Sequence, residues 1–131
     1  KEKSPKINEL GLEIIGRRAV MNFTHLHTHT EYSLLDGSNK IKEYVARVKE
    51  LGMDSAAITD HGVMFGVIDF YKEAKAAGIN PILGCEVYVA PNSRFDREAG
   101  GDDRYYHLVL LAENNTGYQN LMKIVSKGFV E

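Results

Sequence analysis

Closely spaced histidines are the feature of this chain that most clearly points to chemistry. Three of its five histidines, His25, His27 and His29, fall within five residues. Side chains alternate between the two faces of an extended backbone, so the imidazoles of an HxH pair can chelate one ion or two neighbouring ions. Imidazole nitrogen suits borderline divalent metals, zinc especially and also manganese or iron. A single HxH pair is more often part of an ordinary surface strand, so a metal site requires further ligand-type residues.

Such residues follow or fall within each of the strands that the sequence predicts. Asp36 lies in the loop after the first strand, Asp60 and His61 follow the second, Glu86 lies in or near the end of the third, and His107 lies in the fourth. Functional groups of parallel α/β folds gather at the C-terminal ends of the strands, so we expect one shared rim. A carboxylate such as Glu86 could bridge two cations, which together can clamp a phosphoryl oxygen and activate water. Taken singly, Asp60 could be a turn former, His107 a core histidine and Glu86 an ion-paired residue.

Alternating strands and helices would position these residues. Short apolar or alternating runs predict strands, and apolar residues at helical spacing predict helices. The expected order is a strand at 23–27, a helix at 41–51, a strand at 56–59, a helix at 66–77, a strand at 81–89, a polar loop at 91–104, a strand at 105–112 and a final helix from 114 or 115. This order predicts an α/β fold of right-handed βα units with parallel strands.

Local signals indicate where the helices begin and end and which side faces the core. Ser38 or Asn39 can cap the first helix, and Gly52 and Gly78 fit the positions that end the first and second helices. Either asparagine of the pair at 114–115 can cap the third helix. The spacing turns these side chains inward: Ile41, Tyr44, Val45, Val48 and Leu51 in the first helix, Ile68, Tyr71, Ala74 and Ala77 in the second, and Tyr118, Leu121, Ile124 and Val125 in the third.

Length and composition are those of a single globular domain. The chain has 131 residues, 44% of them hydrophobic and 26% charged, which excludes a disordered or collagen-like chain. Its apolar runs are too short to cross a bilayer, and residues 1–20 carry no secretory signal, so we expect a cytoplasmic protein that does not bind membranes. The single cysteine, Cys85, excludes an internal disulfide and is expected to be a small buried residue rather than a nucleophile.

The charge balance limits how the chain could handle phosphates. Sixteen basic and 18 acidic residues give a formal net charge of −2. A protein that binds nucleic acid by counterion release alone should be basic. Positive charge for a phosphate would therefore have to come from bound cations or from another part of a larger assembly. Arg94, Arg97 and Arg104 could also meet phosphates, although a solvated loop is the simpler interpretation of their segment.

Four motifs together resemble the PHP (polymerase and histidinol phosphatase) domain family. The sequence HLHTHTEYSLLDG at 25–37 is similar to the opening of that domain. AITDHG at 57–62 and PILGCEVY at 81–88 are similar to its second and third motifs. HLVLLA at 107–112, followed by NNTGYQNL at 114–121, resembles the branch of the family found in bacterial replicative DNA polymerases.

The resemblance implies a fold and a set of metal ligands. The family fold is a distorted barrel of the (βα)7 type, of which residues 22–131 would be the N-terminal part, without the C-terminal motifs. Residues 1–21 would then be an extension or a tag-like leader. His25 stands where many relatives have Asp, and Asp60 would orient His61, so both are expected to support the ligands rather than bind metal. The ligands implied for a trinuclear centre are His27, His29, Asp36, His61, Glu86 and His107.

The resemblance also implies an activity. Members of the family hydrolyse phosphoesters, and in a parent DNA-directed DNA polymerase the domain would be a 3′→5′ exonuclease for proofreading during DNA replication. Its cofactors would be divalent ions, zinc first and manganese or iron as alternatives, and metal-activated water would be the nucleophile. Two other interpretations stay open: a non-catalytic scaffold stabilised by metal, and a small-molecule phosphatase like histidinol phosphatase. Residues 105–121 favour the polymerase branch over the phosphatase.

Partners and limits follow from the same resemblance. The parent would bind DNA and contact the rest of its polymerase subunit and other replisome subunits. This chain alone is expected to be weak or inactive, because a further histidine and a closing Asp-x-His motif of the family do not occur in it. Part of a barrel leaves a strand edge and apolar helix faces uncovered, so we expect self-association, a partner chain or marginal stability.

Overall fold

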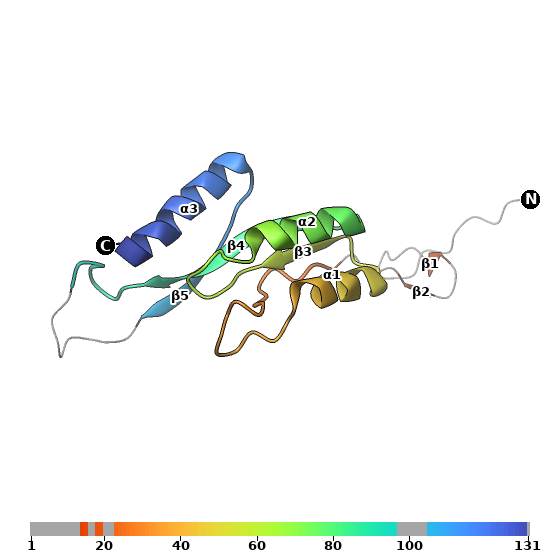
Figure 1. Cartoon of the computed structure of the whole chain (residues 1–131), viewed down its shortest axis with the longest axis horizontal. Coiled ribbons are helices and arrows are strands. Elements are labelled where there is room, and N and C mark those ends of the chain that lie inside the picture. The colour runs from red at the N-terminus through yellow and green to blue at the C-terminus, as the bar shows by residue number, and fades with distance from the viewer. Residues whose placement is uncertain (1–13, 16–17, 20–22, 97–104, 131) are drawn as a thin grey trace, which may run out of the picture.

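The computed structural model describes residues 14–15, 18–19, 23–96 and 105–130. Strands β1 and β2 form a small antiparallel pair, and the other residues of the predicted extension at 1–21 lie outside the described residues. Along the chain the elements are β1 (Ile14–Ile15), β2 (Arg18–Ala19), α1 (Ile41–Glu50), β3 (Ser55–Ile58), α2 (Val67–Ala77), β4 (Asn80–Val89), β5 (Tyr106–Leu111) and α3 (Asn115–Val130), as Figure 1 shows.

The main sheet has three strands in the order β3-β4-β5. Strands β3 and β4 are parallel, with Ser55 opposite Asn80 and Ile58 opposite Leu83, and α2 connects them. This βαβ unit confirms the predicted α/β class with parallel strands. Strand β5, however, runs antiparallel to β4, which corrects the expectation of an all-parallel sheet. A parallel neighbour needs a crossover connection, usually a helix, and the sequence between β4 and β5 has no helical pattern.

The segment predicted as the first strand, 23–27, runs beside β3 without forming a regular strand. The Ala57 amide donates to the carbonyl of His25 (3.3 Å), and the Thr59 amide donates to that of Thr28 (2.8 Å). The two accepting carbonyls are three positions apart and the two donating amides are two positions apart, so this side of the pairing holds one extra residue. One extra residue of this kind interrupts a ladder and bends the backbone. The segment that carries the HxH motif therefore runs along the edge of the sheet without being one of its strands.

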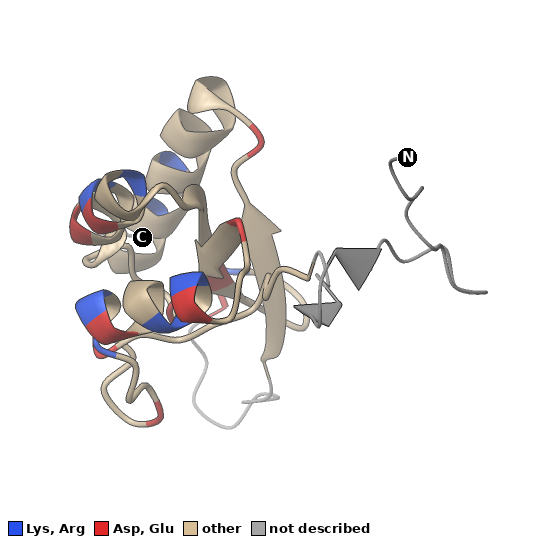
Figure 2. Cartoon of the chain, turned by 90° about the vertical axis from the view of Figure 1, so that its right-hand side faces the viewer, with Lys and Arg blue, Asp and Glu red and all other residues tan. Residues whose placement is uncertain are grey.

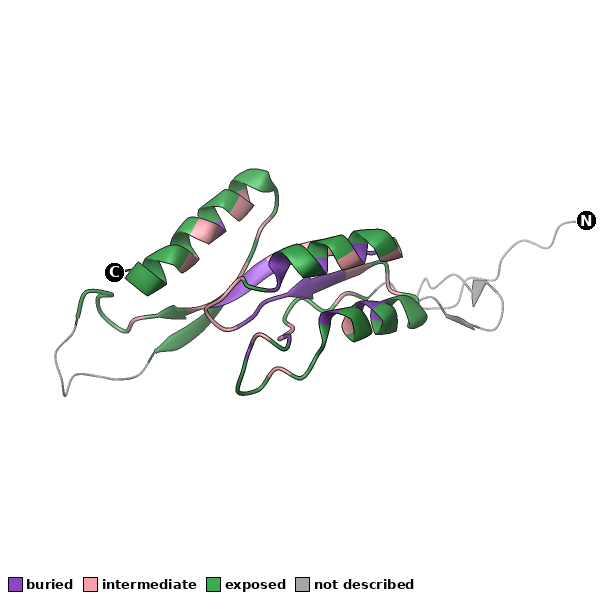
Figure 3. Cartoon of the chain, in the orientation of Figure 1, coloured by how far each residue is buried: buried purple, intermediate pink, exposed green. Residues whose placement is uncertain are grey.

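Helices α1 and α2 pack on each other and on β3 and β4. Figure 3 shows that burial is concentrated there, whereas β5 and α3 are largely exposed. Phe70 of α2 is completely buried at the centre of this core. The core is made of Ile41, Val45, Val48, Ala56, Ile58, Val67, Phe70, Ala74 and Ile79.

The predicted inward face of α2 is partly wrong. Ile68 and Tyr71 are 52% and 44% exposed, whereas Val67 and Phe70 are buried together with Ala74. Both sets of residues have helical spacing, and burying the phenylalanine leaves no polar atom without a partner, whereas burying Tyr71 would require a partner for its hydroxyl. The predicted inward face of α1 is confirmed for its three buried residues, Ile41, Val45 and Val48.

The predicted helix ends are largely confirmed. Gly52 and Gly78 follow α1 and α2 with φ angles of 77° and 78°, a left-handed conformation that glycine adopts without steric cost. Asn114 caps α3, because its side-chain oxygen accepts a hydrogen bond from the amide of Gly117 (3.0 Å). At α1 the N-cap is Lys40, whose side chain makes no capping hydrogen bond. Asn39, one of the two expected caps, instead donates from its side chain to the carbonyl of His29 (2.8 Å).

Candidate metal centre

Four segments bring ligand-type side chains to one place. The HxH segment carries His27 and His29, and His61 follows the C-terminal end of β3. An isolated parallel bridge sets His61 beside Glu86 of β4, and the amide of Gly62 donates to the carbonyl of Glu86 (2.9 Å). In the antiparallel pair, Val109 lies opposite Glu86, so His107 is a diagonal neighbour on the same face. The shared rim thus includes the beginning of an antiparallel strand as well as the end of a parallel one.

Glu86 is the centre of this cluster. Its side chain is only 4% exposed, and imidazoles surround both of its oxygens. Oε2 contacts Nε2 of His27 and lies 2.7 Å from Nε2 of His29. Oε1 contacts Nδ1 of His107 and lies 3.8 Å from Nδ1 of His61. One buried carboxylate therefore connects the four histidines.

Asp36 contacts the cluster from its more exposed side. Its Oδ2 lies 3.0 Å from Nε2 of His61 and 3.4 Å from Nδ1 of His29. Three overlapping groups result, and within each group one donor atom per residue lies within 4.8 Å of the others. The groups are His27 with His29 and Glu86, His29 with Asp36 and His61, and His61 with Glu86 and His107.

The donor set fits divalent ions. Nδ1 of His61 is buried and has no hydrogen-bond partner among the described residues. It lies 3.8 Å from Oε1 of Glu86, which is close enough for both atoms to bind one ion. Nitrogen and carboxylate donors in these numbers are typical of zinc sites and also suit manganese and iron.

The shared histidines limit how the three groups can be filled together. His29 and His61 each present one ring nitrogen to one group and the other nitrogen to the next. A neutral imidazole has one nitrogen with a free lone pair, while the other carries hydrogen. If both histidines held ions beside Glu86, their N–H groups would be free to donate to Asp36. The two groups that contain Glu86 would then be complete at the same time.

Both carboxylates of the cluster are ionised at neutral pH, as metal binding requires. Burial raises the pKa of Glu86, but hydrogen bonds from His29, His27 and His107 together outweigh burial and lower the pKa to about 2. A hydrogen bond from His61 is the main reason that the pKa of Asp36 lies below its ordinary value. The cluster therefore presents two fixed negative charges to a cation.

Buried polar groups support the cluster from behind. Asp60 is 2% exposed, and its Oδ1 accepts hydrogen bonds from the amide of Thr30 (2.6 Å) and the hydroxyl of Ser33 (2.7 Å). The Ser33 oxygen in turn accepts a hydrogen bond from the amide of His61 (3.1 Å). The sequence suggested that Asp60 orients His61; in the structure it acts on the His61 backbone through Ser33.

Ser33 is a supporting residue that the sequence did not single out. Its carbonyl accepts hydrogen bonds from the amides of Asp36 (3.1 Å) and Gly37 (2.7 Å), so Ser33 holds the turns of both Asp36 and His61. Gly37 is required in this turn, because a Cβ there would lie 1.8 Å from the carbonyl oxygen of Thr30. A serine followed three residues later by Asp-Gly is a turn signal that could have indicated this role.

Two other sequence-predicted residues lie outside the three groups. His25 is exposed, packs edge to face on Phe23 with ring centroids 4.7 Å apart, and contributes no atom to the groups. Cys85 is fully buried, as predicted, and burial is the main cause that raises its pKa to about 11. A thiol with this pKa is a structural group and not a nucleophile at neutral pH.

A comparison with known protein families agrees with the motifs and with the geometry of the site. The PHP domain family matches residues 25–131. The chain belongs to the PHP domain family. Its described PHP residues contain no helix with the length and apolarity needed to cross a membrane. Figure 2 shows acidic and basic residues interspersed along α1 and α2, so those helices present no surface of a single charge.

Similar PHP sequences occur in curated polymerase subunits. The chain is 54% identical over 114 residues to a DNA polymerase III subunit alpha from Treponema pallidum, covering 86% of this chain and 10% of that protein. It is 49% identical over 115 residues to the DNA polymerase III subunit alpha of Thermus aquaticus, covering 85% of this chain and 9% of that protein. The chain thus spans about a tenth of the length of the relatives it matches.

Solved structures share the fold of this PHP domain. A protein described as a metal-dependent phosphoesterase from Bifidobacterium adolescentis superposes with a TM-score of 0.53 at 19% identity, over 76% of this chain and 32% of that one. An amidohydrolase from Chromobacterium violaceum, solved with sulfate and no metal, gives 0.54 at 23% identity, over 79% of this chain and 33% of that one. These matches support the mixed α/β architecture.

Proposed function

We propose that this chain is the N-terminal part of the PHP domain of a DNA polymerase III alpha subunit, where it helps to hydrolyse the 3′-terminal phosphodiester of a DNA strand. The observation that carries the proposal is the convergence of four imidazoles and the Asp36 carboxylate around buried Glu86, with the buried Nδ1 of His61 left without a hydrogen-bond partner among the described residues. In the parent, this part would complete a distorted (βα)7-type barrel with later residues, and residues 1–21 would be an extension outside the domain.

The proposed ligands are the six residues of the cluster, and the proposed metal is zinc, with manganese and iron as the competitors. Bound ions would polarise a phosphoryl oxygen and activate water for attack on phosphorus. Glu86 stays anionic and bridges the two groups that it belongs to. Asp36 binds an ion in its own group or, when the groups containing Glu86 are filled, accepts the N–H groups of His29 and His61.

The charge of the chain supports a substrate that would be bound through cations. A formal net charge of −2 does not attract a phosphodiester by itself. Two ionised carboxylates within the site would repel phosphate unless cations lie between them. The parent subunit would bring DNA and other replisome subunits as partners in the cytoplasm, and its further residues would cover the apolar surface through which this chain alone is expected to associate.

Metal analysis of this chain tests the centre. Purified chain is loaded with zinc or manganese, passed through a desalting column and analysed for bound metal. Glu86→Gln keeps the shape of the side chain but removes the charge, so it is expected to lose most of the bound metal. Glu43→Gln, at an exposed position of α1, is the matched control and is expected to retain the bound metal. Equal metal content in wild type and Glu86→Gln would refute the proposed centre.

Hydrolysis assays separate the possible activities. The parent subunit is incubated with single-stranded DNA labelled at its 3′ end, and release of the label is expected to depend on added metal and on Glu86. A parent that binds metal through Glu86 but releases no label would be a metal-stabilised scaffold. Turnover of histidinol phosphate without release from DNA would identify a small-molecule phosphatase.

A further inference from the structure

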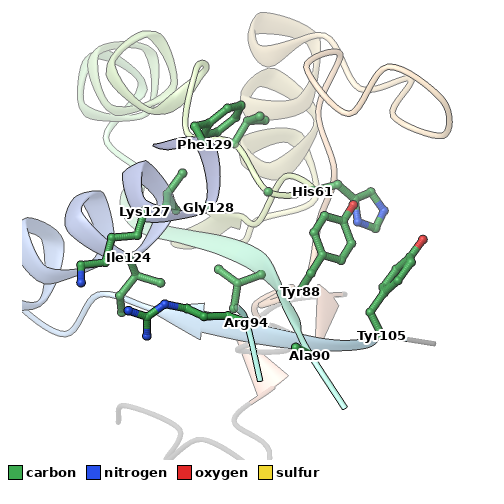
Figure 4. Close-up of a pocket in the computed structure, with 13 residues that line it drawn as sticks. His61, Tyr88, Ala90, Arg94, Tyr105, Ile124, Lys127, Gly128 and Phe129 are labelled. Carbon is green, nitrogen blue, oxygen red and sulfur yellow. The ribbon is translucent and has the colours of Figure 1, made fainter. Parts of the chain in front are cut away.

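A cavity of about 860 Å³ lies beside the metal centre, between α3 and the β4–β5 hairpin (Figure 4). Its volume is within the range of about 300–1,000 Å³ that is typical of sites for one small ligand. His61, a member of two ligand groups, forms part of its wall, so the cavity and the centre share a boundary. None of the described residues that line it is acidic. A ligand in the cavity would therefore lie within reach of the ions.

Two tyrosine rings form the end of the cavity next to the centre. Tyr88 and Tyr105 contact each other edge to face, with centroids 5.1 Å apart, and are 51% and 60% exposed. The ring of Tyr88 is parallel to that of His61 at 6.3 Å, and the ring of Tyr105 is stacked on that of His107 at 5.6 Å. Each tyrosine thus lies against a ligand histidine and keeps much of its surface open to a ligand.

The opposite side of the cavity is basic. Figure 4 shows the side chains of Arg94 and Lys127 on the side away from His61 and Tyr105. Arg94 also lies over the ring of Phe95, at 4.3 Å from its centroid. Apolar side chains of α3, among them Ile124, also line the cavity. The cavity therefore combines aromatic faces, an apolar wall and two cations next to a candidate phosphoesterase centre.

We infer that this cavity binds the 3′-terminal nucleotides of a single DNA strand, with the terminal base stacked on the ring of Tyr105 and its edge against Tyr88, and with the preceding phosphates beside Arg94 and Lys127. Aromatic faces bind unpaired bases with little sequence preference, because every base has a π face, and basic side chains track the backbone. Bases of a duplex are already stacked and paired, so the cavity selects a single strand. The inference rests on the proposed function and defines the substrate of the same site.

Binding without metal tests the cavity separately from the centre. A short oligothymidylate labelled with fluorescein at its 5′ end is titrated with the full chain in EDTA, and fluorescence anisotropy gives the dissociation constant. The same oligonucleotide with an abasic 3′-terminal nucleotide measures the contribution of the terminal base. Wild type is expected to bind the complete oligonucleotide at least about fivefold more tightly, in line with stacking of one base on an aromatic side chain.

Two variants assign this difference to the tyrosines. Tyr105→Leu is expected to remove the preference for the complete oligonucleotide, and circular dichroism checks that it folds. The matched control is Tyr106→Leu, since Tyr106 is the next residue along the chain, is similarly exposed at 58% and does not line the cavity. Arg94→Gln is expected to lower the affinity for both oligonucleotides by the same factor.

The outcomes separate this inference from the proposed function. Equal affinity of wild type for the two oligonucleotides, or a preference that survives Tyr105→Leu, would overturn the inference whatever the metal analysis shows. A preference that depends on Tyr105 would support it even in a chain that binds no metal, because the titration is done in EDTA. Loss of metal binding with an intact preference would therefore refute the centre alone.

Discussion

At the scale of single residues, the candidate centre depends on polar groups that do not contact metal. Asp60 is buried, yet three donors from Thr30 and Ser33 satisfy its carboxylate. A buried carboxylate without such donors would be strongly destabilising. The same hydrogen bonds fix the backbone on either side of the cluster, so stability and ligand position depend on the same few atoms.

Replacing Ser33 with alanine is expected to affect both properties. Ser33→Ala leaves Asp60 without one donor and the His61 amide without its acceptor, and should lower the free energy of unfolding by about 1–3 kcal/mol, measured by urea denaturation. Metal affinity should fall by about tenfold or more, as for other groups that orient ligands. Ser93→Ala is the control, because among the described residues its hydroxyl accepts only an exposed hydrogen bond, from the amide of Phe95, and its loss should change neither property measurably. Matching values for the two variants would exclude the role assigned to Ser33.

The sequence identified the chemistry of the site better than its geometry. Residue type and position at the predicted strand ends pointed to this group of residues, with Asp60 among them, and the resemblance to the PHP family narrowed the expected ligands to the six residues of the cluster. The HxHxH spacing alone does not show which ring turns away; the resemblance gave His25 a supporting role, and His25 lies outside the three groups. The roles of Ser33 and Thr30 depend on hydrogen bonds to a residue about 30 positions away, which no local pattern records.

At the scale of elements, the helices were predicted better than the sheet. Gly52 and Gly78 are local stop signals and lie where α1 and α2 end. The direction of β5 and the interruption at 23–27 depend on hydrogen bonds between strands far apart in sequence. The side of α2 that faces the core was also ambiguous, because two overlapping sets of apolar residues share the helical spacing.

A pair of glycine substitutions tests the stop signal. Gly78 has a φ of 78° with no atom within 4 Å of an added Cβ, so Gly78→Ala introduces backbone strain without a clash. It should destabilise the chain by about 1 kcal/mol. Gly128 also has open space but lies within α3, so Gly128→Ala should stabilise by about 0.5–1 kcal/mol. Thermal unfolding followed by circular dichroism compares the two, and shifts of the same sign would contradict this account.

At the scale of the whole molecule, metal should bind as a set and stabilise the fold. The ligands come from the segment at 23–30, the loop carrying Asp36, the end of β3, and strands β4 and β5, so an ion connects most of the chain. Such ligands are close together only in the folded chain. An ion that binds the folded chain alone raises the free energy of unfolding by about 2.7 kcal/mol at a free concentration of about 100 times its dissociation constant.

Titration with zinc should therefore show two ions per chain and a higher melting temperature. Two is expected because only the two groups that contain Glu86 can be complete at the same time, as the lone pairs of His29 and His61 require. Isothermal titration calorimetry gives the number of ions, and thermal unfolding with and without EDTA gives the stabilisation. Glu86→Gln should show no rise in melting temperature, and a stoichiometry of three would contradict the assignment of lone pairs.

The ring of His61 belongs at once to the ligand cluster and to the wall of the cavity beside Tyr88. Any occupant that favours one position of this imidazole must change the free energy with which the other occupant binds. Thermodynamic linkage makes the effect reciprocal: a strand end that tightens the hold on an ion is itself held more tightly by the loaded protein, by the same factor. Substrate capture and cofactor retention would then be two measurements of a single coupling energy.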